Sequence, residues 1–82
     1  MFGEFIGFKL YTTTYKGVSS NKVAVSIRED EAGWSGDHAI TITGNCDKIG
    51  NYDYNSLIGH IVAIDTNTYN GVEYIKKIAV IK

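Results

Sequence analysis

The stretch DTNTYNGVEYIKK, which begins at Asp65, contains residue types that fit two different structures. A calcium loop needs oxygen ligands at its positions 1, 3, 5 and 12 and a glycine at position 6. Counted from Asp65, position 5 is Tyr69, position 6 is Asn70 and position 12 is Lys76. A positive charge therefore stands at position 12, where a calcium loop has a bidentate glutamate. The alternative is a β-hairpin, because Asn70-Gly71 between two apolar stretches suits a turn with positive φ at both positions. We predict the hairpin, and no metal site.

Residues suited to catalysis are few. His38 and His60 are the only histidines, and Cys46 is the only cysteine. They lack the paired spacing of a zinc site, and nothing beside Cys46 indicates an activated thiolate. Because His60 alternates with Val62 and Ile64, we interpret it as a partly buried structural residue. We expect no catalytic residue and no cofactor, and therefore no enzyme.

Aromatic rings lie near lysines in the first part of the sequence. Binding of single-stranded nucleic acid needs cations that follow the phosphates and flat rings on which bases stack. Tyr11 and Tyr15 lie beside Lys9 and Lys16, which is the combination that this chemistry requires. The alternative is that tyrosines are simply frequent on β-sheet surfaces.

Charge is unevenly distributed along a chain whose net charge is −1. Residues 9–28 hold four basic residues and no acid (+4), residues 29–65 hold seven acids and one lysine (−6), and residues 66–82 hold three lysines and one acid (+2). Two segments of the same sign predict a shared basic face; the alternative is that the lysines are scattered solubilising charges.

The chain length of 82 residues predicts one domain, residues 1–82. A chain of this size buries only about 60% of its unfolded surface, so it needs an efficient core or a partner copy. We find no leader-like segment and no membrane span, and a lone Cys46 fits a reducing compartment. We expect a cytoplasmic protein.

Apolar residues recur with period two, which predicts strands rather than helices. The first predicted strand is EFIGFKLYT, with Ile6, Phe8 and Leu10 on one face and Phe5, Gly7, Lys9 and Tyr11 on the other. The second is KVAVSIR, with Val23, Val25 and Ile27 inward. The third is HAITIT, with Ile40 and Ile42 inward.

Two further strands complete the set. GHIVAIDT is apolar on both faces, which predicts a central strand or one covered by a second copy in a homodimer. In VEYIKKIAVIK the alternation breaks at Lys76-Lys77, and a bulge there would put Ile75, Ile78 and Val80 on one face. We predict an all-β fold, a five-stranded small barrel like the oligonucleotide-binding (OB) barrel with long hairpin loops, and at most a short helix in residues 46–57.

Three pieces of the sequence, TTYKGVS, DTNTYNG and YIKKIAVIK, resemble the first hairpin loop, the dyad loop and the last strand of the small single-stranded DNA-binding proteins of filamentous phages. Those proteins are OB-fold homodimers. The resemblance implies a phosphate contact for Lys16, a base-stacking ring for Tyr69 and a basic strand residue in Lys77. It also implies a phage- or plasmid-type protein.

The chain departs from the family pattern at three basic or aromatic positions. Ala79 occupies the position of the family's next basic residue on the last strand. Thr41 occupies the position of its third-strand lysine, and Val23 or Ala24 that of its second-strand tyrosine. Fewer cations imply weaker binding or a changed ligand. The residues that we predict to bind single-stranded DNA or RNA are Lys9, Tyr11, Tyr15, Lys16, Lys22, Arg28, Tyr69 and Lys77.

A second hypothesis uses the acidic middle of the chain. There Trp34, Tyr52 and Tyr54 lie among carboxylates that would repel phosphates. A small interaction protein, such as an inhibitor of a host enzyme or nuclease, would present these residues to a protein partner. The structural alternatives are a half-buried loop anchor for Trp34 and a cover over the barrel mouth for the two tyrosines.

Overall fold

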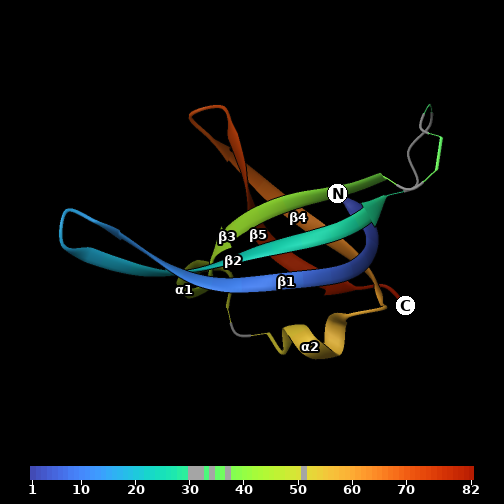
Figure 1. The fold of residues 1–82 in the computed structure, drawn as a ribbon, viewed down its shortest axis with the longest axis horizontal. Coiled ribbons are helices and arrows are strands. Elements are labelled where there is room, and N and C mark those ends of the chain that lie inside the picture. The colour runs from blue at the N-terminus through green and yellow to red at the C-terminus, as the bar shows by residue number, and fades with distance from the viewer. Residues whose placement is uncertain (30–32, 34, 37, 51) are drawn as a thin grey trace.

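Five strands form one sheet that closes into a ring in the order β1-β2-β3-β5-β4 (Figure 1). The computed structural model describes residues 1–29, 33, 35–36, 38–50 and 52–82. The elements are β1 (Phe2–Tyr15), β2 (Val18–Glu29), β3 (His38–Asn45), α1 (Cys46–Ile49), α2 (Tyr54–Leu57), β4 (Ile61–Tyr69) and β5 (Val72–Val80). The prediction of an all-β chain is confirmed, and the short helical segment expected in residues 46–57 consists of two single turns.

The ring is closed by two short seams. β1–β2, β2–β3 and β4–β5 are long antiparallel pairs. By contrast, β1 meets β4 only from Phe2 to Glu4, and β3 meets β5 through one parallel bridge between Thr43 and Tyr74. Next to that bridge, a Cβ added to Gly44 would lie 2.9 Å from Cβ of Ile75. The absence of a side chain at Gly44 therefore lets the two strands approach.

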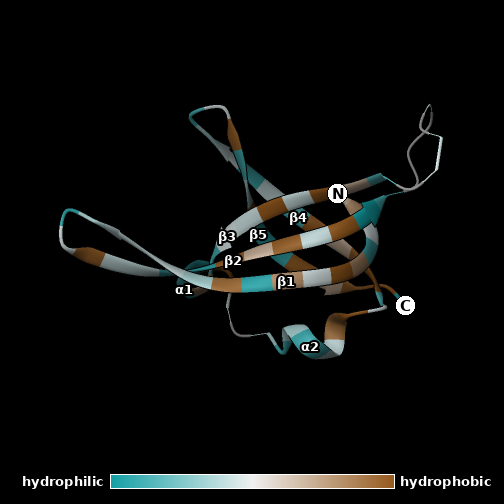
Figure 2. Ribbon diagram, viewed as in Figure 1, coloured by the Kyte–Doolittle hydropathy of each residue, from teal (hydrophilic) through white to brown (hydrophobic). Residues whose placement is uncertain are grey.

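The core lies inside the ring and draws on every strand. Figure 2 shows the hydrophobic bands mainly on the strands around the barrel, whereas the two projecting hairpins are mostly white and teal. The largest fully buried side chains are Phe5, Val23, Val25, Ile27, Val62 and Ile64. The inward faces predicted for the second and third strands are thus confirmed, with Ile42 buried and Ile40 packed against the core.

The predicted face of Phe5 is wrong, because β1 contains a bulge. The register shifts between Phe5 and Gly7, so that Phe5 pairs with Ile27 and Phe8 pairs with Val25. Directly paired residues share a face, and the extra residue therefore turns Phe5 and Phe8 to the same, inner side. Phe5 is fully buried and Phe8 packs against the core.

Two other apolar residues of β1 lie outside the core. Leu10 pairs with Val23, on the inner side, yet it is 58% exposed because β1 runs on past the core. Phe2 at the start of β1 is 59% exposed. Only Phe5 of the three phenylalanines is fully buried.

The bulge predicted in the last strand is confirmed. Asp65 pairs with Lys77 and Thr66 pairs with Ile75, which leaves Lys76 as the extra residue. Ile75 and Ile78 are consequently both buried, as predicted. Val80, predicted to join them, is 50% exposed because it is the last residue of β5.

The fourth strand begins later than the sequence suggested. β4 starts at Ile61 and lies between β1 and β5, which confirms its central position. His60 precedes the strand, so the alternation with Val62 does not extend to it. The prediction of partial burial is wrong: His60 is exposed, and its Nδ1 shares a hydrogen bond of 2.9 Å with the carbonyl of Lys82.

Two-residue turns join the long hairpins. Lys16 and Gly17 have φ of 52° and 78°, and Asn70 and Gly71 have φ of 51° and 78°, as a type I′ turn requires. The hairpin prediction for Asn70-Gly71 is confirmed, and Asp65 lies in β4 rather than in an ion-binding loop.

The helical turns carry aromatic residues onto the core. The Asn45 side chain caps α1 by accepting a hydrogen bond of 2.9 Å from the Asp47 N–H. In α2, Tyr54 is buried, with its ring centroid 5.3 Å from that of Phe8. Tyr52 Oη accepts a hydrogen bond of 3.3 Å from the backbone N–H of Ile78. Within the described residues, no helix has the length and apolarity to cross a membrane.

We predict that Gly44→Ala destabilises the protein by about 1–3 kcal/mol, because the new methyl group must displace the Ile75 side chain at the seam. The free energy of unfolding in urea measures this. Gly7→Ala is the matched control, since a Cβ at Gly7 meets nothing within 4 Å, and it should be neutral or slightly stabilising. Equal stability of the two variants would contradict the proposed role of Gly44.

We also predict that Tyr54 limits stability in alkali. Burial, and secondarily the neighbouring Cys46 thiol, raise the pKa of Tyr54 from 10.0 to about 12. The unfolded chain then ionises this phenol first, so the stabilisation is complete below pH 10 and falls as the pH rises toward 12.

Tyr54→Phe should reduce this alkaline decline in the free energy of unfolding. It should cost little at neutral pH, since the nearest partner of the buried hydroxyl is the Cys46 thiol, which is a weak hydrogen-bonding group. Tyr69→Phe removes an exposed hydroxyl and should keep the wild-type decline. Identical pH profiles for Tyr54→Phe and wild type would refute the assignment.

Candidate functional site

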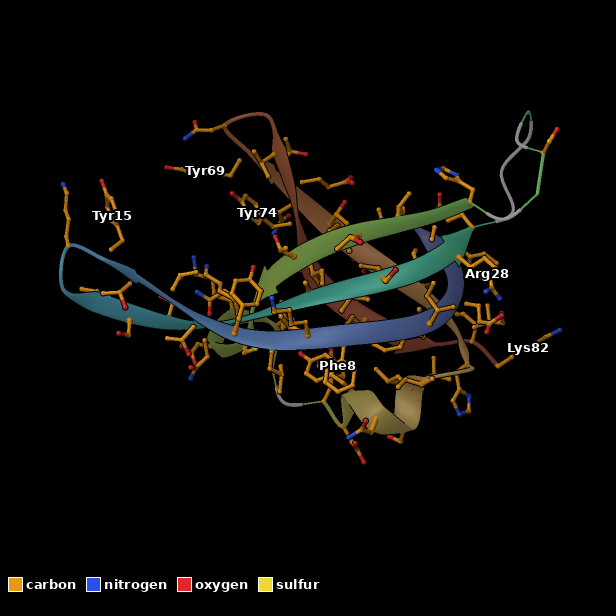
Figure 3. All side chains as sticks on the ribbon, viewed as in Figure 1. Phe8, Tyr15, Arg28, Tyr69, Tyr74 and Lys82 are labelled. Carbon is orange, nitrogen blue, oxygen red and sulfur yellow. The ribbon has the colours of Figure 1, made fainter. Side chains whose placement is uncertain are left out.

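Two hairpin arms project from the barrel on the side away from the chain termini (Figure 1). The first arm is the β1–β2 hairpin around Lys16-Gly17, and the second arm is the β4–β5 hairpin around Asn70-Gly71. In Figure 3, Tyr15 on the first arm and Tyr69 and Tyr74 on the second point toward the space between the arms. The arms therefore present aromatic side chains toward a common region.

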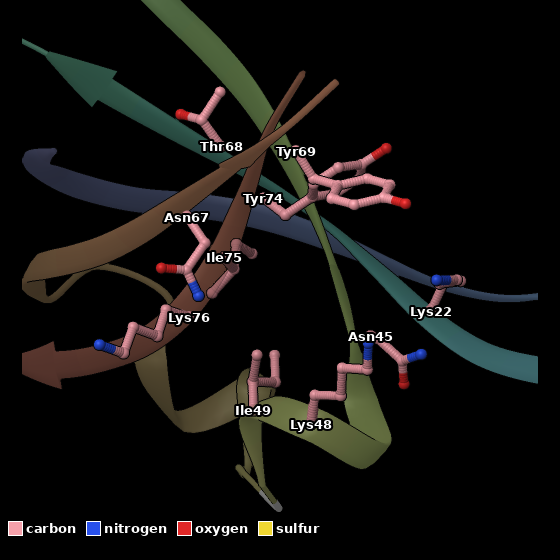
Figure 4. A pocket seen from close by; sticks show the side chains of 10 residues that line it. All are labelled: Lys22, Asn45, Lys48, Ile49, Asn67, Thr68, Tyr69, Tyr74, Ile75 and Lys76. Atoms are coloured by element: carbon pink, nitrogen blue, oxygen red, sulfur yellow. The ribbon is translucent and has the colours of Figure 1, made fainter. Parts of the chain in front are cut away.

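A pocket of about 490 Å³ lies at the base of the second arm (Figure 4). It is lined by Lys22, Asn45, Lys48, Ile49, Asn67, Thr68, Tyr69, Tyr74, Ile75 and Lys76. Three lysines and two tyrosines contribute to this lining, and no acidic residue does among those that the structure describes. The pocket is therefore both aromatic and basic in a protein of net negative charge.

Strand register brings the polar lining together. Lys22 on β2 pairs with Asn45 on β3, and Asn67 on β4 pairs with Tyr74 on β5. The bridge from Thr43 to Tyr74 joins these two pairs of strands. The lining thus comes from residues whose spacing is fixed by backbone hydrogen bonds.

Two lysines reach the pocket through local irregularities. Lys48 lies on α1, directly after the cap formed by Asn45, and Lys76 is the extra residue of the β5 bulge. Without the bulge, strict alternation would place Lys76 on the opposite face from Ile75 and Lys77 on the same face. The bulge therefore leaves Lys76 outside the strand register at the pocket and turns Lys77 to the outer face, opposite Asp65.

Tyr69 and Tyr74 supply the flat surfaces. Tyr69 is 70% exposed, and Tyr74 is also exposed. In Figure 4 the two rings project in the same direction from the β4–β5 hairpin. Exposed rings and lysines that line one pocket suit a ligand that has flat aromatic parts and negative charge.

A shallower hollow continues from the pocket along β1 and β2. It is lined by Leu10, Tyr11, Thr12, Asn21, Lys22 and Cys46. Tyr11 and Lys22 are direct cross-strand partners, and Lys9 lies two residues from Tyr11 on the same face. Lys22 lines both hollows, so it connects this predicted group to the pocket.

The tip of the first arm holds Tyr15 and Lys16. Tyr15 is 74% exposed, and the Lys16 ammonium lies 5.4 Å from the centroid of its ring. These two predicted residues stand outside the lining of the pocket. The Tyr15 side chain points toward the space between the arms in Figure 3.

Two predicted residues lie elsewhere. Arg28 is at the end of the barrel opposite the arms, as is Lys82 (Figure 3), and its Nη1 lies 3.4 Å from Oε1 of Glu4. Lys77 pairs with Asp65 across β4–β5 and does not line the pocket. The structure thus groups Lys22 with Tyr69, and leaves Arg28 and Lys77 apart from them.

The residues predicted for protein contact are also separated from the arms. Trp34 lies outside the described residues. Tyr54 is buried and Tyr52 is half-buried beside it, with ring centroids 5.9 Å apart. Both tyrosines pack on the core, where they are held by the contacts described above.

Three charged or aromatic residues of the pocket escaped the sequence analysis, namely Lys48, Tyr74 and Lys76. Lys48 was counted within the acidic middle of the chain. The sequence from Asn45 to Asp47 indicates the start of a helical turn, but it does not indicate which surface that turn contacts. Tyr74 directly precedes Ile75, and adjacent residues of a strand face opposite ways. Because Ile75 was predicted to face inward, the sequence already indicated that the Tyr74 ring faces outward.

Among the described residues, no group of three or more histidines, cysteines or carboxylates gathers as a metal site. No protein-family model, no curated protein and no solved structure matches this chain.

Proposed function

We propose that this protein binds single-stranded nucleic acid on the surface between its two arms. The observation that carries this proposal is the pocket whose lining combines Lys22, Lys48 and Lys76 with the exposed rings of Tyr69 and Tyr74. Lysines attract phosphates as point charges, and tyrosine rings offer stacking surfaces to bases. Bases in a duplex are already stacked and shielded, so the rings favour a single strand.

The chain order of the elements supports an OB-type barrel, which we propose as the finer description of the ring. The helical turns lie between β3 and β4, and the two arms join β1 to β2 and β4 to β5. In OB folds, the face of strands 2 and 3 and these two hairpin loops bind oligonucleotides. The pocket includes residues from β2, β3 and the β4–β5 hairpin, in keeping with that arrangement.

A protein contact is the second candidate function. It would use the acidic middle of the chain, but Tyr54, one of its three candidate residues, is buried, and Tyr52 is half-buried against the core. We therefore keep nucleic acid as the proposed partner. Failure of the protein to bind any oligonucleotide at low salt would favour the protein contact.

The salt dependence of binding tests the proposal. Lys16, Lys22, Lys48 and Lys76 belong to the arms and pocket, and a single strand releases about 0.7 counterion per phosphate contact. Four contacts predict a slope of about −3 in a plot of log affinity against log salt. Fluorescence anisotropy with labelled oligo(dT) and oligo(U) measures this slope and compares DNA with RNA.

Adjacent lysines provide the sharpest variants. Lys76→Ala should weaken binding to all sequences alike and flatten the slope by about 0.7, because Lys76 lines the pocket. Lys77→Ala removes the same charge from the next position, which faces Asp65 in the register, and should leave the slope unchanged. A larger effect of Lys77→Ala would place the ligand farther along the outer face of β5, beside Asp65, rather than at the pocket.

We also propose a homodimer formed through an apolar row outside the barrel. Phe2 pairs with Ala63, which pairs with Ala79, and Ala63 alternates with the inward Val62. Phe2 and the nearby Ile81 are exposed in the single chain. A second copy packed on this row would add the apolar burial that a short chain lacks.

Sedimentation at high micromolar concentration should therefore show a dimer, and Phe2→Asp should shift it toward the monomer. Leu10→Asp is the control, because Leu10 is an equally exposed apolar residue away from the row. A strict monomer for the wild-type protein would contradict the proposal.

A further inference from the structure

The tips of the two arms have nearly the same sequence. Residues 14–18 read Thr-Tyr-Lys-Gly-Val, and residues 68–72 read Thr-Tyr-Asn-Gly-Val. Only the first turn residue differs, being Lys16 in one tip and Asn70 in the other. The two pentapeptides come from opposite ends of the chain, yet the fold brings both to the ends of projecting hairpins (Figure 1).

The two tips also have the same local structure. Tyr15 pairs with Val18 across the first turn, and Tyr69 pairs with Val72 across the second. The φ angles of the two turn residues agree within one degree between the tips, being 52° and 78° in one and 51° and 78° in the other. Each tip therefore presents a tyrosine and a valine side by side on one face of its hairpin.

The fold itself does not require this repeated pair. A tight turn needs only residues that accept positive φ, and neither the tyrosine nor the valine of either tip is buried. Lysine is moreover a poor choice for positive φ, which favours glycine, asparagine and aspartate. Lys16 nonetheless occupies this position, with its ammonium over the Tyr15 ring. A ligand explains both the pair and the lysine.

Outward side chains connect the first arm to the second. One row of paired residues runs across all five strands, through Lys9, Ala24, Thr43, Tyr74 and Asn67. The neighbouring row holds Tyr11, Lys22 and Asn45. These rows provide cations and a further ring between the tips, so an extended anionic chain can follow one surface from tip to tip.

We propose that the two tips are equivalent subsites for one continuous single strand, each stacking one base on its tyrosine while the intervening nucleotides cross the outward rows. This inference rests on the proposed function and adds to it that binding is bivalent within one protein chain. Two linked contacts to one ligand gain affinity because the second forms at a high effective concentration. Only an oligonucleotide long enough to reach both tips benefits.

A length series tests bivalency. Anisotropy titrations with oligo(dT) of about 4 to about 24 nucleotides span the usual site sizes of OB folds. The wild-type affinity should rise abruptly at the length that reaches both tips and only gradually beyond it. Tyr15→Ala and Tyr69→Ala should each lower the affinity for long oligonucleotides by about 5- to 150-fold and remove the abrupt rise.

The turn residues provide matched controls. Lys16→Asn gives the first tip the sequence of the second and should flatten the salt slope by about 0.7, whereas Asn70→Lys does the reverse and should steepen it by about the same amount. The double variant, which exchanges the two turn residues, should bind long oligonucleotides like the wild-type protein. Urea unfolding should show that all these surface variants retain the wild-type fold.

The outcomes separate this inference from the proposed function. If the wild-type protein binds oligonucleotides and Tyr69→Ala weakens binding, but Tyr15→Ala is silent at every length, the function stands and the second subsite is overturned. A smooth rise of affinity with length would also overturn it. Absence of binding by the wild-type protein at any length in low salt overturns the function and the inference together.

Discussion

The ring depends on the close approach of β3 and β5 at Gly44. These strands share a single bridge, from Thr43 to Tyr74, and a side chain on Gly44 would collide with Ile75 beside it. Because Gly44 leaves that space, Ile75 points into the core. Neighbours on a strand face opposite ways, so Tyr74 must then point outward. The contact that closes the barrel therefore also places one of the two rings in the pocket, which ties the proposed function to the packing of the core.

The arms follow from a different balance of forces. The buried residues lie in the barrel, whereas the ends of both hairpins are exposed and contain several threonines. They are held by backbone pairing and by cross-strand side-chain contacts, such as the hydrogen bond of 2.8 Å that Thr66 donates to Glu73 and the 3.1 Å contact between the hydroxyls of Thr14 and Ser19. Segments with few buried contacts open at lower free energy than the core. The arms can consequently adjust to a flexible ligand while the barrel keeps the pocket residues in register.

Patterns within single segments could be predicted from the sequence, and pairings between segments could not. Alternation in the second strand identified Val23, Val25 and Ile27, and the break at Lys76-Lys77 identified a bulge. The bulge at Phe5–Gly7 left no such break, because Phe5, Ile6 and Phe8 are all apolar and fit either register. Lys48 could not be assigned to the pocket, because the cap at Asn45 predicts a helical turn but not the neighbour of that turn. The resemblance to the phage single-stranded DNA-binding proteins implied a role for Lys77, whereas the adjacent Lys76 lines the pocket.

The electrostatics of the site depend on the same register rather than on the overall charge. Interactions between exposed charges are screened beyond about 8–10 Å in physiological salt, so the net charge of −1 matters less to a bound phosphate than the side chains around it. Acidic residues close in sequence to the pocket lysines are directed elsewhere: Asp65 pairs with Lys77, and the Glu73 carboxylate accepts the hydrogen bond from Thr66. One extra residue in β5 thereby puts a lysine in the pocket and the adjacent lysine opposite an acid. The segment charge of +2 for residues 66–82 does not distinguish the two lysines. The charge of the surface around the pocket therefore follows from the strand register at the bulge and not from the composition.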